Sequence, residues 1–210
     1  MRPTAWKNVA VRTRCVLTIC ALLTGCLGTR GYIPVHYYTL ELPTDNTPRA
    51  TRSWAIPLGI QPFTAATRYR ERMVYRLSEV EVNFYEYNRW VEPPAEMVTR
   101  IVATMLHASG LFPQVQQVTN LRLPAWVLSA VLLRFDEVRG AHQRRAECWL
   151  QVELRRAQDE RLLWGKTLRA AVPLSSQSAA ALASAMSAAV QQIARQLITE
   201  LQMADLPGAE

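Results

Sequence analysis

The strongest constraint on the fold is a group of three adjacent segments with strand periodicity in the second half of the chain. Residues 125–137 are apolar on both faces, which is expected of a central strand that is covered on both sides. Residues 147–156 alternate between apolar and polar positions, and residues 161–172 follow after a short turn. The inward positions of the second segment are Cys148, Leu150, Val152 and Leu154. Because the connections are short, the three strands are predicted to form an antiparallel meander.

Two segments with helical periodicity precede and follow this meander. Pro93 and Pro94 suit a first helical turn, and Gly110 suits a helix end. A longer helix is predicted to begin after a serine cap at Ser175 or Ser176. The apolar faces comprise Met97, Val98, Ile101, Val102, Met105 and Leu106 in the first helix and Leu182, Met186, Val190, Ile193, Leu197 and Leu201 in the second. Each face needs a partner surface, and the sheet is the obvious one.

Shorter strand patterns precede the first helix. Residues 36–42 predict a first strand and residues 56–63 a second, although Pro57 and Pro62 would confine the second strand to a sheet edge or a bulge. Residues 72–87 predict a hairpin. Strands, helix, strands and helix in this order predict an α+β fold in a single domain, with a mixed, largely antiparallel sheet packed against two main helices.

The amino terminus has the three parts of a secretory signal. A cationic start is followed by an apolar run of nine residues, 15–23, and by Thr24 and Gly25 before Cys26. Nine helical residues rise only about 14 Å, which is too short to span a bilayer. The end of this segment resembles the bacterial lipoprotein box; the alternatives are an ordinary signal peptide and a buried helix that happens to contain cysteine. The resemblance implies that Cys26 becomes the first mature residue, carries a diacylglycerol on its thiol and is acylated on its amine.

Four parts of the chain follow from this assignment. We predict a signal peptide at residues 1–25, a lipidated tether at 26–35, one folded domain at 36–205 and a tail at 206–210. The signal contains four cationic and no acidic side chains, so its removal lowers the formal net charge from +7 to +3. Leu27 follows the lipid-bearing cysteine, whereas an aspartate there would resemble the inner-membrane retention signal. The expected location is therefore the outer membrane, lipid-anchored on its periplasmic face.

No catalytic, cofactor-binding or metal site is predicted. Cys148 lies on an apolar strand face, where a thiol is usually an inert small hydrophobe. His36, His107 and His142 lack metal-ligand spacing such as HExxH. The chain has no glycine-rich phosphate loop and no nucleic-acid-binding motif, so neither ATP hydrolysis nor a nucleic-acid partner is expected.

Several short motifs occur in an order typical of one lipoprotein family. After the lipoprotein box come YYTL at 37–40, PLGI at 57–60, RMVYR at 72–76, YNRW at 87–90 and SGLF at 109–112. In this order and spacing the chain resembles the ABC-type transport auxiliary lipoproteins, the family of the paraquat-inducible intermembrane transport lipoprotein. The resemblance runs from Cys26 to the last helix, and among functional residues it transfers only the lipidated cysteine.

The resemblance also implies a function and partners. Members of the family accompany MCE-domain lipid transporters, in which an inner-membrane ABC pump works with substrate-binding MCE proteins. The implied role is a non-enzymatic docking component for the MCE-domain protein, held in the membrane by N-terminal acyl chains. A ring-forming homo-oligomer is left open. Two other functions are also left open: a periplasmic lipid-binding carrier lipoprotein, which would need an apolar cavity, and a cell-envelope enzyme.

A cluster of aromatic and arginine side chains around the predicted hairpin is the candidate partner interface. Its residues are Arg72, Tyr75, Arg76, Arg89 and Trp90. Aromatic and arginine residues dominate binding hot spots, and arginine forks suit phosphate or carboxylate groups on a partner. The alternative is that the rings cover a sheet face and the arginines are solvated.

Overall fold

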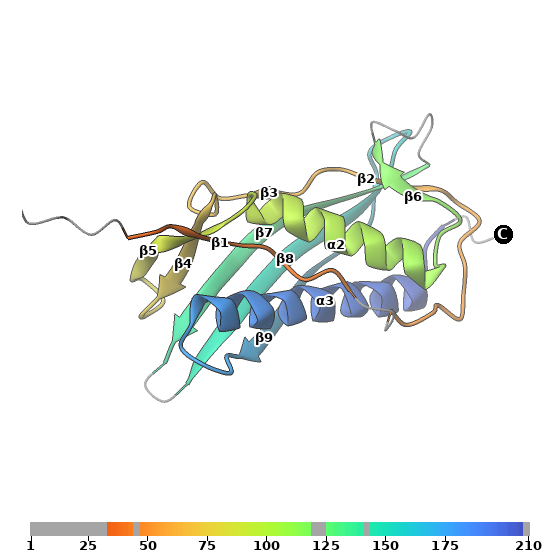
Figure 1. The fold of residues 1–210 in the computed structure, drawn as a ribbon. Helices are drawn as coiled ribbons and strands as arrows, with labels where there is room; N and C mark the ends of the chain where they lie inside the picture. Colours follow the sequence, from red (N-terminus) through yellow and green to blue (C-terminus); the bar gives the residue numbers. More distant parts are fainter. Residues whose placement is uncertain (1–32, 44–46, 119–124, 141–142, 208–210) are drawn as a thin grey trace, which may run out of the picture. The chain divides into compact units, whose positions relative to one another are not determined.

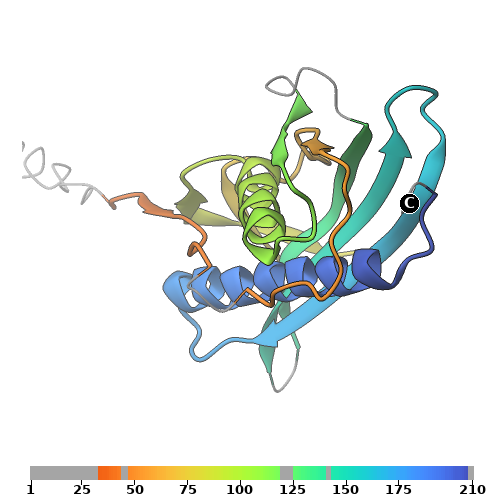
Figure 2. The same cartoon turned by 90° about the vertical axis from the view of Figure 1, so that its right-hand side faces the viewer.

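In the part of the chain that the structure describes, a nine-stranded mixed sheet and two helices form the domain, and both helices lie on the same face of the sheet (Figures 1 and 2). The computed structural model describes residues 33–43, 47–118, 125–140 and 143–207. Cys26 and the predicted signal peptide lie outside the described residues. The strands are β1 (His36–Tyr38), β2 (Leu58–Ile60), β3 (Thr64–Ala65), β4 (Arg72–Arg76), β5 (Val82–Trp90), β6 (Val115–Gln117), β7 (Trp126–Arg139), β8 (Arg144–Arg156) and β9 (Leu162–Pro173), and the helices are α2 (Pro94–Ser109) and α3 (Ala179–Met203).

The long strand β7 organises the sheet. Its partner β8 runs antiparallel along its whole length, and β9 pairs antiparallel with β8, which confirms the predicted meander. Along the other edge of β7, three short strands pair parallel one after another. β2 pairs at its beginning, β3 at its middle and β4 near its end. The predicted α+β fold is therefore confirmed, with short parallel pairings added to long antiparallel ones.

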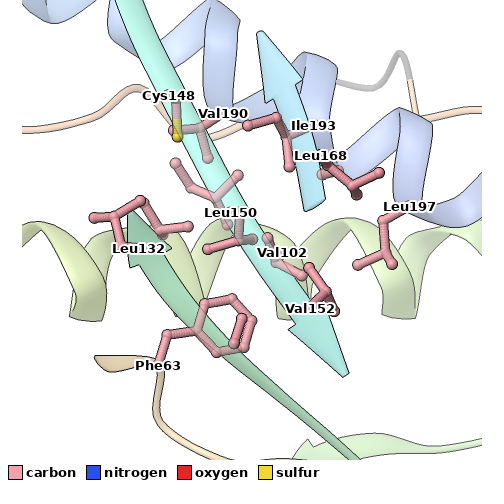
Figure 3. Packing of buried hydrophobic residues seen from close by; sticks show 14 of the residues in the cluster. Phe63, Val102, Leu132, Cys148, Leu150, Val152, Leu168, Val190, Ile193 and Leu197 are labelled. Atoms are coloured by element: carbon pink, nitrogen blue, oxygen red, sulfur yellow. The ribbon is translucent and has the colours of Figure 1, made fainter. Parts of the chain in front are cut away.

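The core lies between the inward face of the meander and the two helices (Figure 3). Cys148, Leu150, Val152 and Leu154 alternate inward along β8, and all four side chains are fully buried. Val190, Ile193 and Leu197 of α3 approach the same face from the helix side (Figure 3). The predicted apolar face of α2 is also buried, and Gly110 ends this helix in the left-handed conformation with a φ of 71°. A glycine tolerates that φ without the Cβ penalty.

The second strand does not lie at a sheet edge, which corrects the prediction made from its prolines. β2 is only three residues long and sits between β6 and β7, paired parallel with both. Pro57 and Pro62 lie just outside these three residues, so their missing N–H groups do not interrupt the ladder. The N–H of Leu58, directly after Pro57, donates to the carbonyl oxygen of Gln114 at 2.9 Å.

The prediction that β7 is covered on both faces is wrong for its first half. Val131 and Leu133 are 41% and 36% exposed, whereas the alternate side chains Ala130 and Leu132 are buried. The reason is that the helices cover only one face of the sheet. Burial on both faces begins after the register shift between Leu132 and Arg134.

Some boundaries also differ from the predictions. The first strand ends at Tyr38, because the chain then leaves the sheet and the Glu41 N–H donates to Ser187 of α3 at 2.9 Å. The cap of α3 is Ser178, whose hydroxyl accepts from the Ala181 N–H at 3.1 Å. Leu206, predicted to begin a tail, is buried in the core. Within the described chain, neither helix combines the length and hydropathy needed to cross a membrane.

Candidate functional site

The structure divides the five residues of the candidate interface into two groups. Trp90 is buried in the core, where its ring meets Phe135 edge to face with centroids 5.3 Å apart. Arg76 is also buried. Arg72 is exposed, and Tyr75 and Arg89 are half-buried. Of the five residues, only Arg72, Tyr75 and Arg89 therefore have side-chain surface that an external molecule can reach.

Arg76 is buried because it forms an ion pair with a carboxylate of the central strand. Its guanidinium contacts Asp136 of β7, which is fully buried, and also donates to the backbone carbonyl of Glu79 at 3.1 Å. The second carboxylate oxygen of Asp136 has no hydrogen-bond partner among the described residues. Periodicity within β4 could not reveal this pairing, because the partner lies 60 positions further along the chain. Arg76 therefore joins β4 to β7 rather than to a partner protein.

Tyr75 belongs to a second buried network, centred on Glu137. This carboxylate accepts hydrogen bonds from the Tyr85 hydroxyl at 2.6 Å and from Arg139 Nε at 2.9 Å. Arg144 adds a third donor at 3.2 Å. Tyr75 packs edge to face on Tyr85, and the Arg139 guanidinium lies 3.5 Å from the centre of the Tyr75 ring. The hydrogen bonds and the cation–π contact fix the position of the Tyr75 ring.

Because the Tyr85 hydroxyl belongs to this network, the stability of the fold is expected to depend on pH in the alkaline range. Burial, reinforced by the hydrogen bond to Glu137, raises the pKa of Tyr85 to about 12, against an opposing effect of Arg139. Between pH 10 and 12 the unfolded phenol loses its proton while the folded one keeps it, so folding stability falls as pH rises. We expect Tyr85→Phe to reduce this fall by about 1–2 kcal/mol.

Urea unfolding at several pH values between 8 and 12 measures this effect. Two lysines and six other tyrosines also titrate in or near this window, so the measured quantity is the difference between the pH profiles of the variant and the wild type. Tyr37→Phe alters an exposed phenol in β1 and is the matched control. Parallel pH profiles of the wild type and Tyr85→Phe would contradict the expectation.

A third network lies on strands β7 and β8. Arg134 donates to Glu147 and to Glu79, each at 2.7 Å, and Arg145 Nε donates to the other oxygen of Glu147 at 2.7 Å. Burial alone would raise the pKa of Glu147, but the hydrogen bonds from the two arginines outweigh it and hold the pKa below its ordinary value. A carboxylate so held is ionised and paired at neutral pH, as expected of a structural ion cluster.

The tip of the β4–β5 hairpin, residues 77–81, exposes two apolar side chains. Leu77 is 49% exposed and Val80 is 93% exposed. The turn is nevertheless ordered, because the Ser78 hydroxyl accepts from the N–H groups of Val80 and Glu81 at 3.4 and 3.1 Å. The Leu77 N–H also donates to the Glu81 carbonyl oxygen at 3.1 Å. The tip is therefore a hydrogen-bonded turn that exposes two apolar side chains.

A pocket of about 390 Å³ opens beside the same hairpin. It is lined by Thr67, Arg68, Arg70, Glu71, Arg72, Phe84 and Arg89, and we call it the arginine pocket. The segment between β3 and β4 supplies Arg68 and Arg70, and the strands supply Arg72 and Arg89. The Trp90 N–H donates to the Glu71 carbonyl oxygen at 2.6 Å and so joins this segment to β5. Sequence analysis missed Arg68, although the alternation of arginines at 68, 70 and 72 could have indicated it.

The remaining reactive side chains do not form a site in the described part of the chain. Cys148 is fully buried in the core, as predicted, and burial raises the pKa of its thiol. His36 and His107 are exposed, and His142 lies outside the described residues. Within the described segments, no three His, Cys, Asp or Glu side chains converge as metal ligands would.

Comparisons with known proteins identify relatives in sequence and in fold. Residues 38–198 match the model of a family described as the ABC-type transport auxiliary lipoprotein component. A crystal structure of a protein from Xanthomonas campestris, described under the family model DUF330, is 22% identical with a TM-score of 0.72, covering 80% of this chain and 96% of that one. The crystal structure of an uncharacterized protein is 12% identical with a TM-score of 0.65, covering 80% and 99%. No curated protein matches the chain in sequence.

Proposed function

The chain belongs to the ABC-type transport auxiliary lipoprotein family, and from this membership we propose that it docks the MCE-domain protein of an ABC lipid transporter at the outer membrane. The observation that carries the proposal is the family match, which spans residues 38–198 and thus nearly all of the folded domain. In this proposal Cys26 carries the acyl chains, and the domain faces the periplasm. The role is non-enzymatic, and a homo-oligomer is compatible with it.

The positions and partners of the ionisable side chains agree with a docking role. Asp136, Glu137 and Glu147 are each engaged by arginine, and Cys148 is sealed in the core. An acid–base or nucleophilic mechanism requires such groups to reach a substrate. The hairpin tip, in contrast, presents ordered apolar side chains to the outside.

Crosslinking of native membranes followed by purification of the full-length lipoprotein tests the proposal. We expect the MCE-domain protein to be recovered in a defined ratio. The double variant Leu77→Asp with Val80→Asp should reduce this recovery by about tenfold, because it places charge in the centre of the proposed contact. Met203→Asp changes an apolar residue of α3 that is 71% exposed, and it serves as the control.

Two outcomes would contradict the docking role. The first is the absence of any MCE-domain protein from the wild-type preparation. The second is a stoichiometric lipid extracted from a purified protein that has no protein partner, which would favour the lipid-binding carrier. Equal recovery of the MCE-domain protein with the tip variant and with the wild type would show that the contact does not involve the hairpin tip.

A further inference from the structure

We propose that the arginine pocket binds the phosphate group of a phospholipid headgroup. This inference rests on the proposed function, because a lipid-transport partner would bring phospholipid to the domain, and it names a ligand and a site for that function.

The pocket holds a concentrated positive charge. Four arginines and one glutamate line it, which gives a formal charge of +3. The mature chain from Cys26 onward also has a formal charge of +3, since the signal removes four of the seven positive charges. Positive and negative side chains therefore balance over the rest of the mature sequence. A cleft lined with one sign of charge raises the local concentration of ligands of the opposite sign.

The pocket arginines differ from most other arginines of the domain in their partners. Arg76, Arg134 and Arg139 each form an ion pair with a buried carboxylate, and Arg100, Arg144, Arg145, Arg155 and Arg156 also have acidic partners. Within the described residues, no ion pair joins Arg68, Arg70, Arg72 or Arg89 to a carboxylate. Their guanidinium donors are therefore available to an external anion.

The register of the hairpin places two of these charges directly opposite each other. Arg72 of β4 pairs with Arg89 of β5 across the strands. Like charges at a cross-strand pair destabilise a sheet, and an anion bound between them would remove that repulsion. The Arg72 guanidinium also lies 4.9 Å from the centre of the Phe84 ring, a contact that orients its donors. The site is thus partly arranged before a ligand arrives.

The dimensions and composition of the pocket suit a headgroup. Its volume of about 390 Å³ is at the lower end of the range found for small-ligand sites. Arginine forks match the paired oxygens of a phosphate diester. Phe84, which is 37% exposed, adds an apolar wall against which the glycerol part of a headgroup can lie.

Titration calorimetry on the full-length lipoprotein in a non-ionic detergent tests this inference. The probes are glycerophosphoglycerol, which is a lipid headgroup without acyl chains, inorganic phosphate, and a short polyglutamate peptide. We expect saturable binding of glycerophosphoglycerol that is at least about tenfold weaker in the double variant Arg70→Glu with Arg72→Glu. Arg49→Glu with Arg161→Glu is the matched control, because it makes the same charge change at exposed positions outside the pocket and should bind like the wild type.

Each outcome decides the inference. Tighter binding of the headgroup than of inorganic phosphate supports the lipid source, and binding of inorganic phosphate alone overturns it. Binding of polyglutamate without the headgroup also overturns it and assigns the pocket to an acidic protein segment. Equal losses in the pocket variant and the control would show non-specific charge attraction, which likewise overturns the site.

The same samples separate this inference from the docking proposal. Loss of headgroup binding with normal recovery of the MCE-domain protein leaves docking intact and isolates the pocket. A pocket variant that still unfolds in urea like the wild type shows that its binding defect is not a folding defect. The proposal is wrong if glycerophosphoglycerol neither binds saturably to the wild-type protein nor changes its thermal stability.

Discussion

Replacing Cys26 with alanine is expected to abolish acylation and to remove the protein from the outer-membrane fraction. Each acyl CH₂ buried in a membrane contributes about 0.8 kcal/mol, and a single chain anchors a protein only marginally. Three chains on the wild-type cysteine would make attachment effectively permanent, whereas the variant has none. Incorporation of labelled palmitate, followed by density separation of the two membranes, measures the difference. The variant should also keep its leader and migrate as the larger precursor.

Cys148→Ala provides the matched control for this experiment. Cys148 is fully buried in β8, so its removal should leave palmitate incorporation and membrane location unchanged. Label retained by Cys26→Ala would contradict the assignment of the lipid anchor. An unmodified amino terminus in the wild-type protein, determined by mass spectrometry, would do so equally.

Replacing Asp136 with alanine is expected to destabilise the domain by about 3–5 kcal/mol. The change leaves the buried Arg76 guanidinium without its counter-charge, and only the Glu79 carbonyl oxygen still accepts from it. An uncompensated buried charge is among the largest single-site penalties in a protein core. Because ordinary domains are stable by only about 5–15 kcal/mol, this loss should be evident in urea unfolding followed by tryptophan fluorescence.

Two further variants test whether the loss of stability comes from breaking the buried ion pair or from removing any carboxylate. Asp159→Ala breaks an exposed pair with Arg156 at 3.4 Å and loses a hydrogen bond of 3.3 Å from the Arg161 N–H, so it should change stability by about 1 kcal/mol or less. Adding Arg76→Met to Asp136→Ala removes the stranded charge and should restore more than half of the loss. Equal losses of unfolding free energy in Asp136→Ala and Asp159→Ala would show that the buried pair does not stabilise the domain more than an exposed pair does.

Much of the fold could be predicted from local patterns. Alternation along β8 identified its inward residues, and prolines and Gly110 located both ends of α2. These signals are local, since they depend on side chains within one strand or helix. The start of α3 was harder to predict, because several serines precede the helix and only the Ser178 side chain caps its first turn.

The errors arose where partners are distant in sequence. The buried position of Arg76 depends on Asp136, and the interior position of β2 depends on β6 and β7. Alternation within one segment carries no information about such partners. The exposed half of β7 was missed for a related reason, because apolar composition does not show which face the helices leave uncovered.

The candidate site was only partly predictable. Arg72, Tyr75 and Arg89 were identified from composition, and the structure keeps them at or near the surface. Trp90 was included because tryptophan is common in binding hot spots, but a large ring also fills a core efficiently. Arg68 was missed because it lies outside the predicted hairpin, although its alternation with Arg70 and Arg72 is visible in the sequence.

The pairing of three short strands with β7 has a consequence for the proposed export. β2, β3 and β4 precede β7 in the chain, and each pairs with it. In the proposed export from the amino terminus, these strands would emerge first, while β7 is still behind the membrane. Isolated short strands are marginal in water, and non-local pairing forms late. The β4–β5 hairpin can form before β7 arrives, whereas we expect β2 and β3 to stay unpaired until β6 and β7 have crossed.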